Sequence, residues 1–155
     1  MPPTDRVLID LEDVDALVGQ MRRIHASGSG WLNLLPLIDP DTPVPATPSA
    51  LAVFSKRGPA VPLVTWTPAS RGSRPEPTTL GVQHGVGSAL AARLPGTPAE
   101  LPEGWRVVSD HPRRGLVVQV PDHVDDAAVA TWLLHLVDAV SMIPHTGRVE
   151  VFVYP

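Results

Sequence analysis

The residues best suited to chemistry lie in one predicted turn, which joins two strand-like runs within residues 105–120. Pro112 presets φ for a tight turn, and Gly115 can adopt the positive φ that closes a short hairpin loop. Local sequence therefore brings an acid, an imidazole and two guanidinium groups together at the tip. Such a tip can bind an anion or assist catalysis, although polar hairpin tips are also ordinary solvated surface. The four residues are Asp110, His111, Arg113 and Arg114.

A second candidate site is the glycine-rich stretch 81–88, which precedes a short alanine-rich helix that we expect to continue through Leu94. A glycine-rich approach to a helix N-terminus presents free backbone N–H groups to an anion, and the helix dipole adds to the attraction. No Lys precedes Ser88, as a Walker loop requires, and Leu90 stands where a dinucleotide fingerprint needs its third Gly. The alternative is that the glycines only permit a tight turn or close packing. The predicted ligand-binding residues are Gly85, Gly87, Ser88, Arg113 and Arg114.

A catalytic hypothesis joins these two places through His84, Asp110 and His111. An Asp can orient an imidazole that acts as a general base, and nearby arginines can stabilise an oxyanion or bind a carboxylate. The separation in sequence does not show that the two segments meet. No His-x-x-x-His or His-x-His spacing supports a metal site, so we predict neither metal nor cofactor. The chain also lacks the Gly-x-Ser-x-Gly elbow of one class of hydrolases.

Composition limits the class of protein. The chain has 155 residues, of which 43% are hydrophobic and 18% charged, and this fits one globular domain over residues 1–155. A net charge of −4 repels phosphate, so we expect neither nucleic acid nor an anionic membrane as a partner. With no Cys, the chain cannot form disulfides or thiolate metal sites. It has no apolar run of the roughly 18 residues that span a bilayer and no secretory signal pattern, so we expect a cytoplasmic protein.

Two longer helices are predicted. The first begins near Asp10 and ends before Gly28, with one apolar stripe at helical spacing. The second is capped by Asp122 or Asp125 and ends at Pro144, and it is apolar nearly all round. Such a helix is either deeply buried or covered by another subunit. Because burial on both sides is hard to arrange in a small chain, we predict a homo-oligomer formed through this C-terminal helix.

Three of the remaining histidines lie on or beside this second helix. His135 and Asp138 are three residues apart on one helical face, which fits a pair as well as it fits two exposed residues. His123 precedes the helix and His145 follows it, so both are interpreted as structural boundary residues unless they converge on the same pocket.

The order of elements predicts an α+β sandwich. We expect about six mostly antiparallel strands in one sheet, with three helices largely on one face, because strand hairpins alternate with single helices. Residues 1–7 are expected to be frayed, and the proline-rich stretches 39–49 and 68–80 to be loops. The predicted strands cover residues 31–38, 50–55, 61–67, the two arms of the hairpin within 105–120, and 148–154.

Three functions from different classes follow from these features. The first is a non-enzymatic interaction or self-associating module, indicated by the apolar C-terminal helix and the proline-rich loops. The second is a binder of a small anion or metabolite through Arg113, Arg114 and the turn near His84. The third is a small hydrolase or transferase that uses His84, Asp110 and His111.

Overall fold

A single antiparallel sheet organises the chain. The computed structural model describes residues 1–44 and 58–155, and in these residues the strand order is β1-β7-β2-β3-β4-β6-β5. All neighbouring strands are antiparallel, which confirms an α+β fold with a mainly antiparallel sheet. The strands are β1 (Asp5–Asp10), β2 (Trp31–Pro36), β3 (Leu63–Thr67), β4 (Thr78–Gln83), β5 (Arg106–His111), β6 (Gly115–Val120) and β7 (Arg148–Tyr154).

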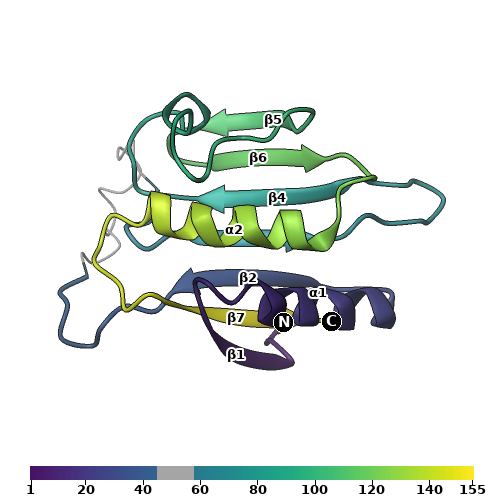
Figure 1. The fold of residues 1–155 in the computed structure, drawn as a ribbon, viewed down its shortest axis with the longest axis horizontal. Helices are drawn as coiled ribbons and strands as arrows, with labels where there is room; N and C mark the ends of the chain where they lie inside the picture. The colour runs from purple at the N-terminus through teal and green to yellow at the C-terminus, as the bar shows by residue number, and fades with distance from the viewer. Residues whose placement is uncertain (45–57) are drawn as a thin grey trace.

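Both α-helices lie on the same face of this sheet, in front of it in Figure 1. Helix α1 spans Val14–Ser27 and helix α2 spans Asp126–Val140, and the two helices pack against each other as well as against the sheet. Alternate residues of the strands point towards them, so the buried side chains of β2, β3, β4, β6 and β7 form one core with the helices.

Helix ends follow local sequence rules. The side chain of Asp13 accepts a hydrogen bond from the backbone N–H of Ala16, and Gly28 ends α1 in the left-handed conformation. At α2, Asp125 accepts from the N–H of Ala128, so it is the cap rather than Asp122. The start predicted near Asp10 for the first helix was therefore a few residues early, because Asp10 still belongs to β1.

Three further expectations about the elements were wrong. Residues 5–7 are not frayed, because strand β1 pairs along its whole length with β7, with Asp5 opposite Val153. The loop expected over 68–80 ends before Thr78, where β4 begins. The short helix expected to continue through Leu94 is only the 3₁₀ turn η2 (Ala91–Arg93). The described residues thus contain two α-helices and seven strands, and the strand expected over 50–55 lies outside them.

The chain itself buries the apolar helix α2. Eight of its residues are buried, Val129, Ala130, Trp132, Leu133, Leu134, Leu136, Val137 and Val140. The segment before β5 packs against this helix at Trp132. There, the indole N–H of Trp132 donates to the carbonyl oxygens of Ala99 and Glu100, at 3.1 and 3.2 Å, and its ring meets that of Trp105 edge-on at 5.3 Å. These apolar residues are therefore buried without a second copy of the chain.

Candidate functional site

The predicted turn at the tip of the β5–β6 hairpin is present and closes as expected. Gly115 has a φ of 95°, the positive value that the short loop requires. A Cβ at this position would also overlap the carbonyl oxygen of Val82 on the neighbouring strand β4. The glycine is therefore needed both for the turn and for the close approach of β6 to β4.

Asp110 connects this hairpin to the start of η2, just after the glycine-rich stretch. Its two carboxylate oxygens accept hydrogen bonds from the backbone N–H groups of Leu90, at 2.9 Å, and Ala91, at 2.8 Å. This contact brings the hairpin beside the segment that follows His84, as the catalytic hypothesis required. The same contact engages the amides at the start of η2 with a carboxylate of the chain itself, so these two N–H groups are not available to an external anion.

His84 is buried beneath the same segment, with 1% of its surface exposed. Its Nδ1 accepts a hydrogen bond from the backbone N–H of Val86 at 3.3 Å, so the neutral ring carries its proton on Nε2. That N–H has no partner among the described residues. Burial lowers the pKa of His84, the charge of Asp110 opposes this shift, and the positive charge of Arg93 adds to it. The ring is consequently held neutral and offers a donor, whereas a general base needs a free acceptor.

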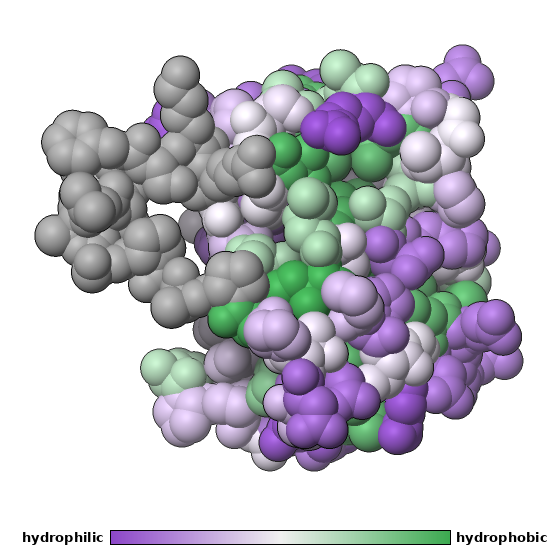
Figure 2. Space-filling model, turned by 90° about the vertical axis from the view of Figure 1, so that its left-hand side faces the viewer, coloured by the Kyte–Doolittle hydropathy of each residue, from purple (hydrophilic) through white to green (hydrophobic). Residues whose placement is uncertain are grey.

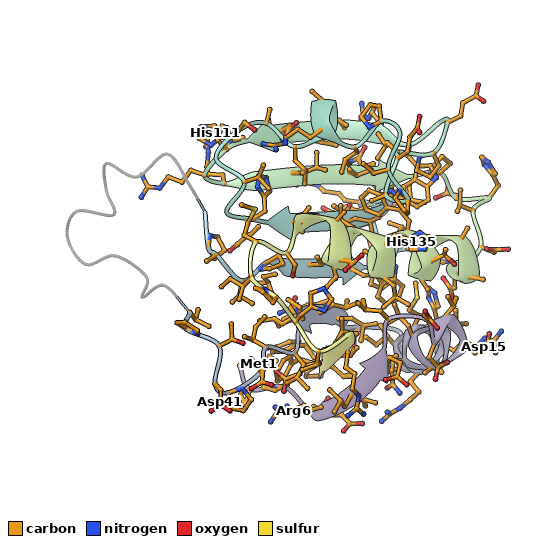
Figure 3. All side chains as sticks on the ribbon, turned by 60° about the vertical axis from the view of Figure 1, so that its left-hand side comes forward. Met1, Arg6, Asp15, Asp41, His111 and His135 are labelled. Carbon is orange, nitrogen blue, oxygen red and sulfur yellow. The ribbon has the colours of Figure 1, made fainter. Side chains whose placement is uncertain are left out.

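The other predicted site residues have structural contacts of their own. His111, at the upper left in Figure 3, uses Nδ1 to accept the backbone N–H groups of Arg113 and Arg114, at 3.1 and 3.3 Å. Both of these arginines are exposed. This end of the molecule carries interspersed hydrophilic and hydrophobic residues (Figure 2).

The glycines and the serine of the glycine-rich segment also have structural explanations. A Cβ on Gly85 would lie 2.8 Å from the carbonyl oxygen of Pro59, so this glycine permits close packing of two backbone segments. Gly87 has a φ of 80°, which requires a glycine at the turn. The hydroxyl of Ser88 accepts a hydrogen bond from Arg93 at 3.2 Å. The structure therefore brings His84 and Asp110 close to the turn, but the Asp110 carboxylate and Nδ1 of His84 bond to backbone groups of the chain itself.

A cleft of about 800 Å³ lies elsewhere, between the start of α1, the second half of α2 and the loop before β7. In it, His145 donates from Nε2 to Asp138 at 2.9 Å and accepts at Nδ1 from the N–H of Gly147 at 3.1 Å. His135 donates from Nδ1 to the carbonyl oxygen of Pro98 at 3.1 Å. Asp138 thus pairs with His145 and not with its helical neighbour His135. Sequence reasoning missed this pair because its members are separated by the end of a helix and a turn.

A larger open cleft of about 1440 Å³ separates the end of α1 from the loop between β3 and β4. His25 lies at its border, 3.2 Å from the carboxylate of Asp126 and edge-on to the ring of Trp66 at 5.3 Å. The described residues contain no group of three or more acidic or histidine side chains that could hold a metal ion. Within the same residues, no helix is long and apolar enough to cross a membrane.

The outer edge of strand β1 presents backbone N–H and C=O groups. The N–H of Leu11 donates to the carbonyl oxygen of Gly147, which continues the β1–β7 register. Because the backbone of an antiparallel strand bonds to alternate sides, the odd-numbered residues of β1 face β7 and the even-numbered ones face outwards. Those outward residues are Arg6, Leu8 and Asp10, and all three are exposed. Arg6 lies at the lower rim of the molecule in Figure 3.

The other edge of the sheet, β5, is protected. Its register with β6 shifts between Val107 and Ser109, which is a β-bulge. A bulge twists an edge strand and interrupts the row of groups that another strand would need. Asp110 further attaches the end of β5 to the segment that contains η2. Strand β1 has no register shift along its six residues, so the two edges of this sheet differ.

Comparison of the chain with protein-family models, with curated proteins and with solved structures gives no match.

Proposed function

We propose that this chain is a protein-interaction module that binds by adding a partner strand to the outer edge of β1. The observation that carries the proposal is the set of backbone groups on that edge. The N–H and C=O of Leu8, the C=O of Arg6 and the N–H of Asp10 have no hydrogen-bond partner in residues 1–44 and 58–155. Main-chain hydrogen bonds supply the affinity in strand addition, and the alternating side chains supply the selectivity.

The side chains of β1 support this interpretation. Leu8 is 40% exposed and lies between two charged residues of opposite sign, Arg6 and Asp10. Charged residues on an edge strand discourage indiscriminate pairing. A pattern of positive, apolar and negative side chains on one face still accepts a strand that carries the complementary pattern. The edge is therefore selective, and it differs from an aggregation-prone edge that is apolar throughout.

The proposed function belongs to the class that the sequence indicated, a protein-interaction module, but its interface is strand β1 and not helix α2. Self-association was expected through α2, whose apolar residues are buried within the chain. The anion-binding and catalytic hypotheses both relied on polar atoms of the β5–β6 tip and its neighbours. Several of these atoms, in Asp110, His111 and His84, instead hold the backbone of the fold.

Leu8→Pro tests the proposal, because the N–H that it removes faces outwards and does not bond to β7. Leu8→Ala is the matched control, since it shortens the same side chain and keeps the N–H. We expect ten-residue peptides selected on the wild-type protein from a random library to bind Leu8→Ala, and to bind Leu8→Pro at least about tenfold more weakly, as loss of a main-chain bond worth about 1.4 kcal/mol requires.

Fluorescence anisotropy measures this binding, and thermal unfolding of both variants verifies that they fold. Peptides that bind the two variants with equal affinity would contradict strand addition at β1. The same conclusion would follow if the peptides protected amides elsewhere from hydrogen exchange and left Leu8 and Asp10 unprotected.

A further inference from the structure

We infer that the strand that pairs with β1 is β1 of a second copy of the chain, running antiparallel about a two-fold axis at Leu8. This inference rests on the proposed function and names the partner of the same edge. In this register, Leu8 lies opposite Leu8 of the second copy and Arg6 lies opposite Asp10. Three independent properties of the strand agree with it: its backbone groups, its charges and its apolar side chains.

The free backbone groups match each other in this register. Residues that face outwards in an antiparallel pair exchange hydrogen bonds with the residues directly opposite. Each Leu8 would donate to, and accept from, Leu8 of the second copy. Each Asp10 N–H would donate to the free C=O of the opposite Arg6. All four kinds of free group on this edge are then satisfied.

The two outward backbone groups that this pairing leaves over are already satisfied within the chain. The N–H of Arg6 donates to the side chain of Asp5 at 2.8 Å, and the C=O of Asp10 accepts from the N–H of Asp13 at 2.9 Å. In the inferred register these two groups would stand opposite each other. In this register each satisfied backbone group would face a satisfied group of the second copy, and each free N–H would face a free C=O.

The charges are complementary in the same register. Arg6 would lie beside Asp10 of the second copy on the face of the sheet that carries no helix, and the two-fold axis repeats this contact. Within each chain, Arg6 pairs with Glu150 of β7 and Asp10 pairs with Arg148 at 3.2 Å. Across the boundary, charges of alternating sign would follow one another from Glu150 through Arg6 and the opposite Asp10 to its Arg148. A shift by two residues would instead place a charged residue opposite Leu8, which would then lack an apolar neighbour.

The apolar residues complete the match. The exposed side chains of the two Leu8 residues would meet at the axis. On the helix-covered face, Val7 would lie opposite Ile9, next to the core that both residues already contact. The axis stands perpendicular to the sheet, so the two sheets would continue into one and all the helices would remain on the same face. Such an interface is closed, because each edge is used once.

Disulfide cross-linking tests the register, and the chain suits it because its sequence has no Cys. Leu8→Cys would place two thiols on directly opposed residues, whose Cα atoms are about 5.5 Å apart in such a pair, within the range that a disulfide spans. We expect mild oxidation to convert most of this variant into a covalent dimer. Arg6→Cys alone should stay monomeric on a denaturing gel, since its two copies would be roughly 14 Å apart. An equimolar mixture of Arg6→Cys and Asp10→Cys should cross-link.

The oligomeric state without cross-linking is the second measurement. Leu8→Lys would place two like charges at the axis, and its side chain is exposed in the single chain, so the fold should persist. Val108→Lys is the matched control, because Val108 is 51% exposed on the opposite edge strand β5. In sedimentation velocity over a range of concentrations we expect a dimer for the wild type and Val108→Lys, and a monomer for Leu8→Lys.

A wild-type protein that stays monomeric, together with no cross-linking of Leu8→Cys, would overturn the inference. If selected peptides still bind wild-type β1 in that case, the proposed function stands and only the identity of its partner is wrong. A wild-type dimer that Leu8→Lys does not disrupt would also overturn the inference, because the interface would then lie elsewhere.

Discussion

Removing the indole of Trp132 measures how the chain covers its apolar helix α2. The residue is 3% exposed, and its side chain makes two kinds of contact that differ in energy. The ring packs in the core and against Trp105 at 5.3 Å. The N–H donates to two carbonyl oxygens of the segment before β5, those of Ala99 and Glu100. Substitution by Ala removes both contacts, whereas substitution by Phe removes the N–H and keeps most of the apolar surface.

The expected magnitudes follow from these contacts. Truncation of a buried Trp to Ala costs about 3 to 5 kcal/mol, so we expect Trp132→Ala to lower the free energy of unfolding by about 4 kcal/mol. For Trp132→Phe the main loss is the hydrogen bond, with two carbonyl groups left without this donor, and we expect about 2 kcal/mol. Urea unfolding followed by far-ultraviolet circular dichroism gives both values, provided that the transition has two states.

Ala139→Ser provides the control on the same helix, because Ala139 is exposed and the substitution should change stability by only about 0.5 kcal/mol. A loss below about 1 kcal/mol for Trp132→Ala would refute the reasoning. It would mean that the segment around Ala99 does not cover α2 in solution, and the helix would again be available as an interface. Equal losses for the Ala and Phe variants would show that the hydrogen bond, and not the packing of the ring, dominates.

Two further predictions concern the region around His84. Gly115→Ala should lower the free energy of unfolding in urea by about 3 kcal/mol, because it combines a positive φ with overlap of the Val82 carbonyl oxygen. Gly96→Ala is the control and should cost only about 1 to 2 kcal/mol, since Gly96 has a φ of 77° and a Cβ there would have nothing within 4 Å. Equal costs would contradict the close approach of β6 to β4. Burial lowers the pKa of His84 below its usual 6.5, so below that pH the unfolded chain binds more protons than the folded one. The contribution of His84 to the free energy of unfolding should therefore be fully present above about pH 6.5. It should decrease as the pH falls towards the lower pKa of the folded state. His84→Asn should make the decrease in unfolding free energy between about pH 7.5 and 5.5 smaller, and an unchanged decrease would show that His84 is not its source.

Local features of the chain could be predicted because only a few neighbouring residues decide them. The positive φ of Gly115, the left-handed Gly28 and the Asp125 cap all depend on residues within one turn of each other. The apolar stripe of α1 could likewise be recognised from its spacing, and its residues Leu17, Val18, Met21 and Ile24 are buried. Strand β4 was not predicted, because Gly81 interrupts its pattern and Gly85 and Gly87 follow it closely, although β3 and β6 pair with it on both sides.

The contacts that decide the candidate site join residues far apart in the chain. Asp110 bonds to amides 19 and 20 residues away, and Trp132 bonds to carbonyl groups more than 30 residues away. Neither partner can be inferred from spacing, because a side chain with several acceptable partners takes the one that the packed sheet places beside it. For the same reason, the sequence indicated that α2 must be covered but could not say by what.

The sequence by itself determined the class of fold, the end of the first helix at Gly28, the turn at Gly115 and the exclusion of thiol chemistry, since each depends on residue type or on short-range backbone geometry. Only the tertiary structure decided that β1 and β5 are the edges of the sheet, that α2 is covered from within, and that the outward groups of β1 are Arg6, Leu8 and Asp10. The physical reason is that strand order and hydrogen-bond direction are set by pairing between distant segments. Strand β1 could be assigned an open edge only once β7, from the other end of the chain, was seen to occupy its inner side.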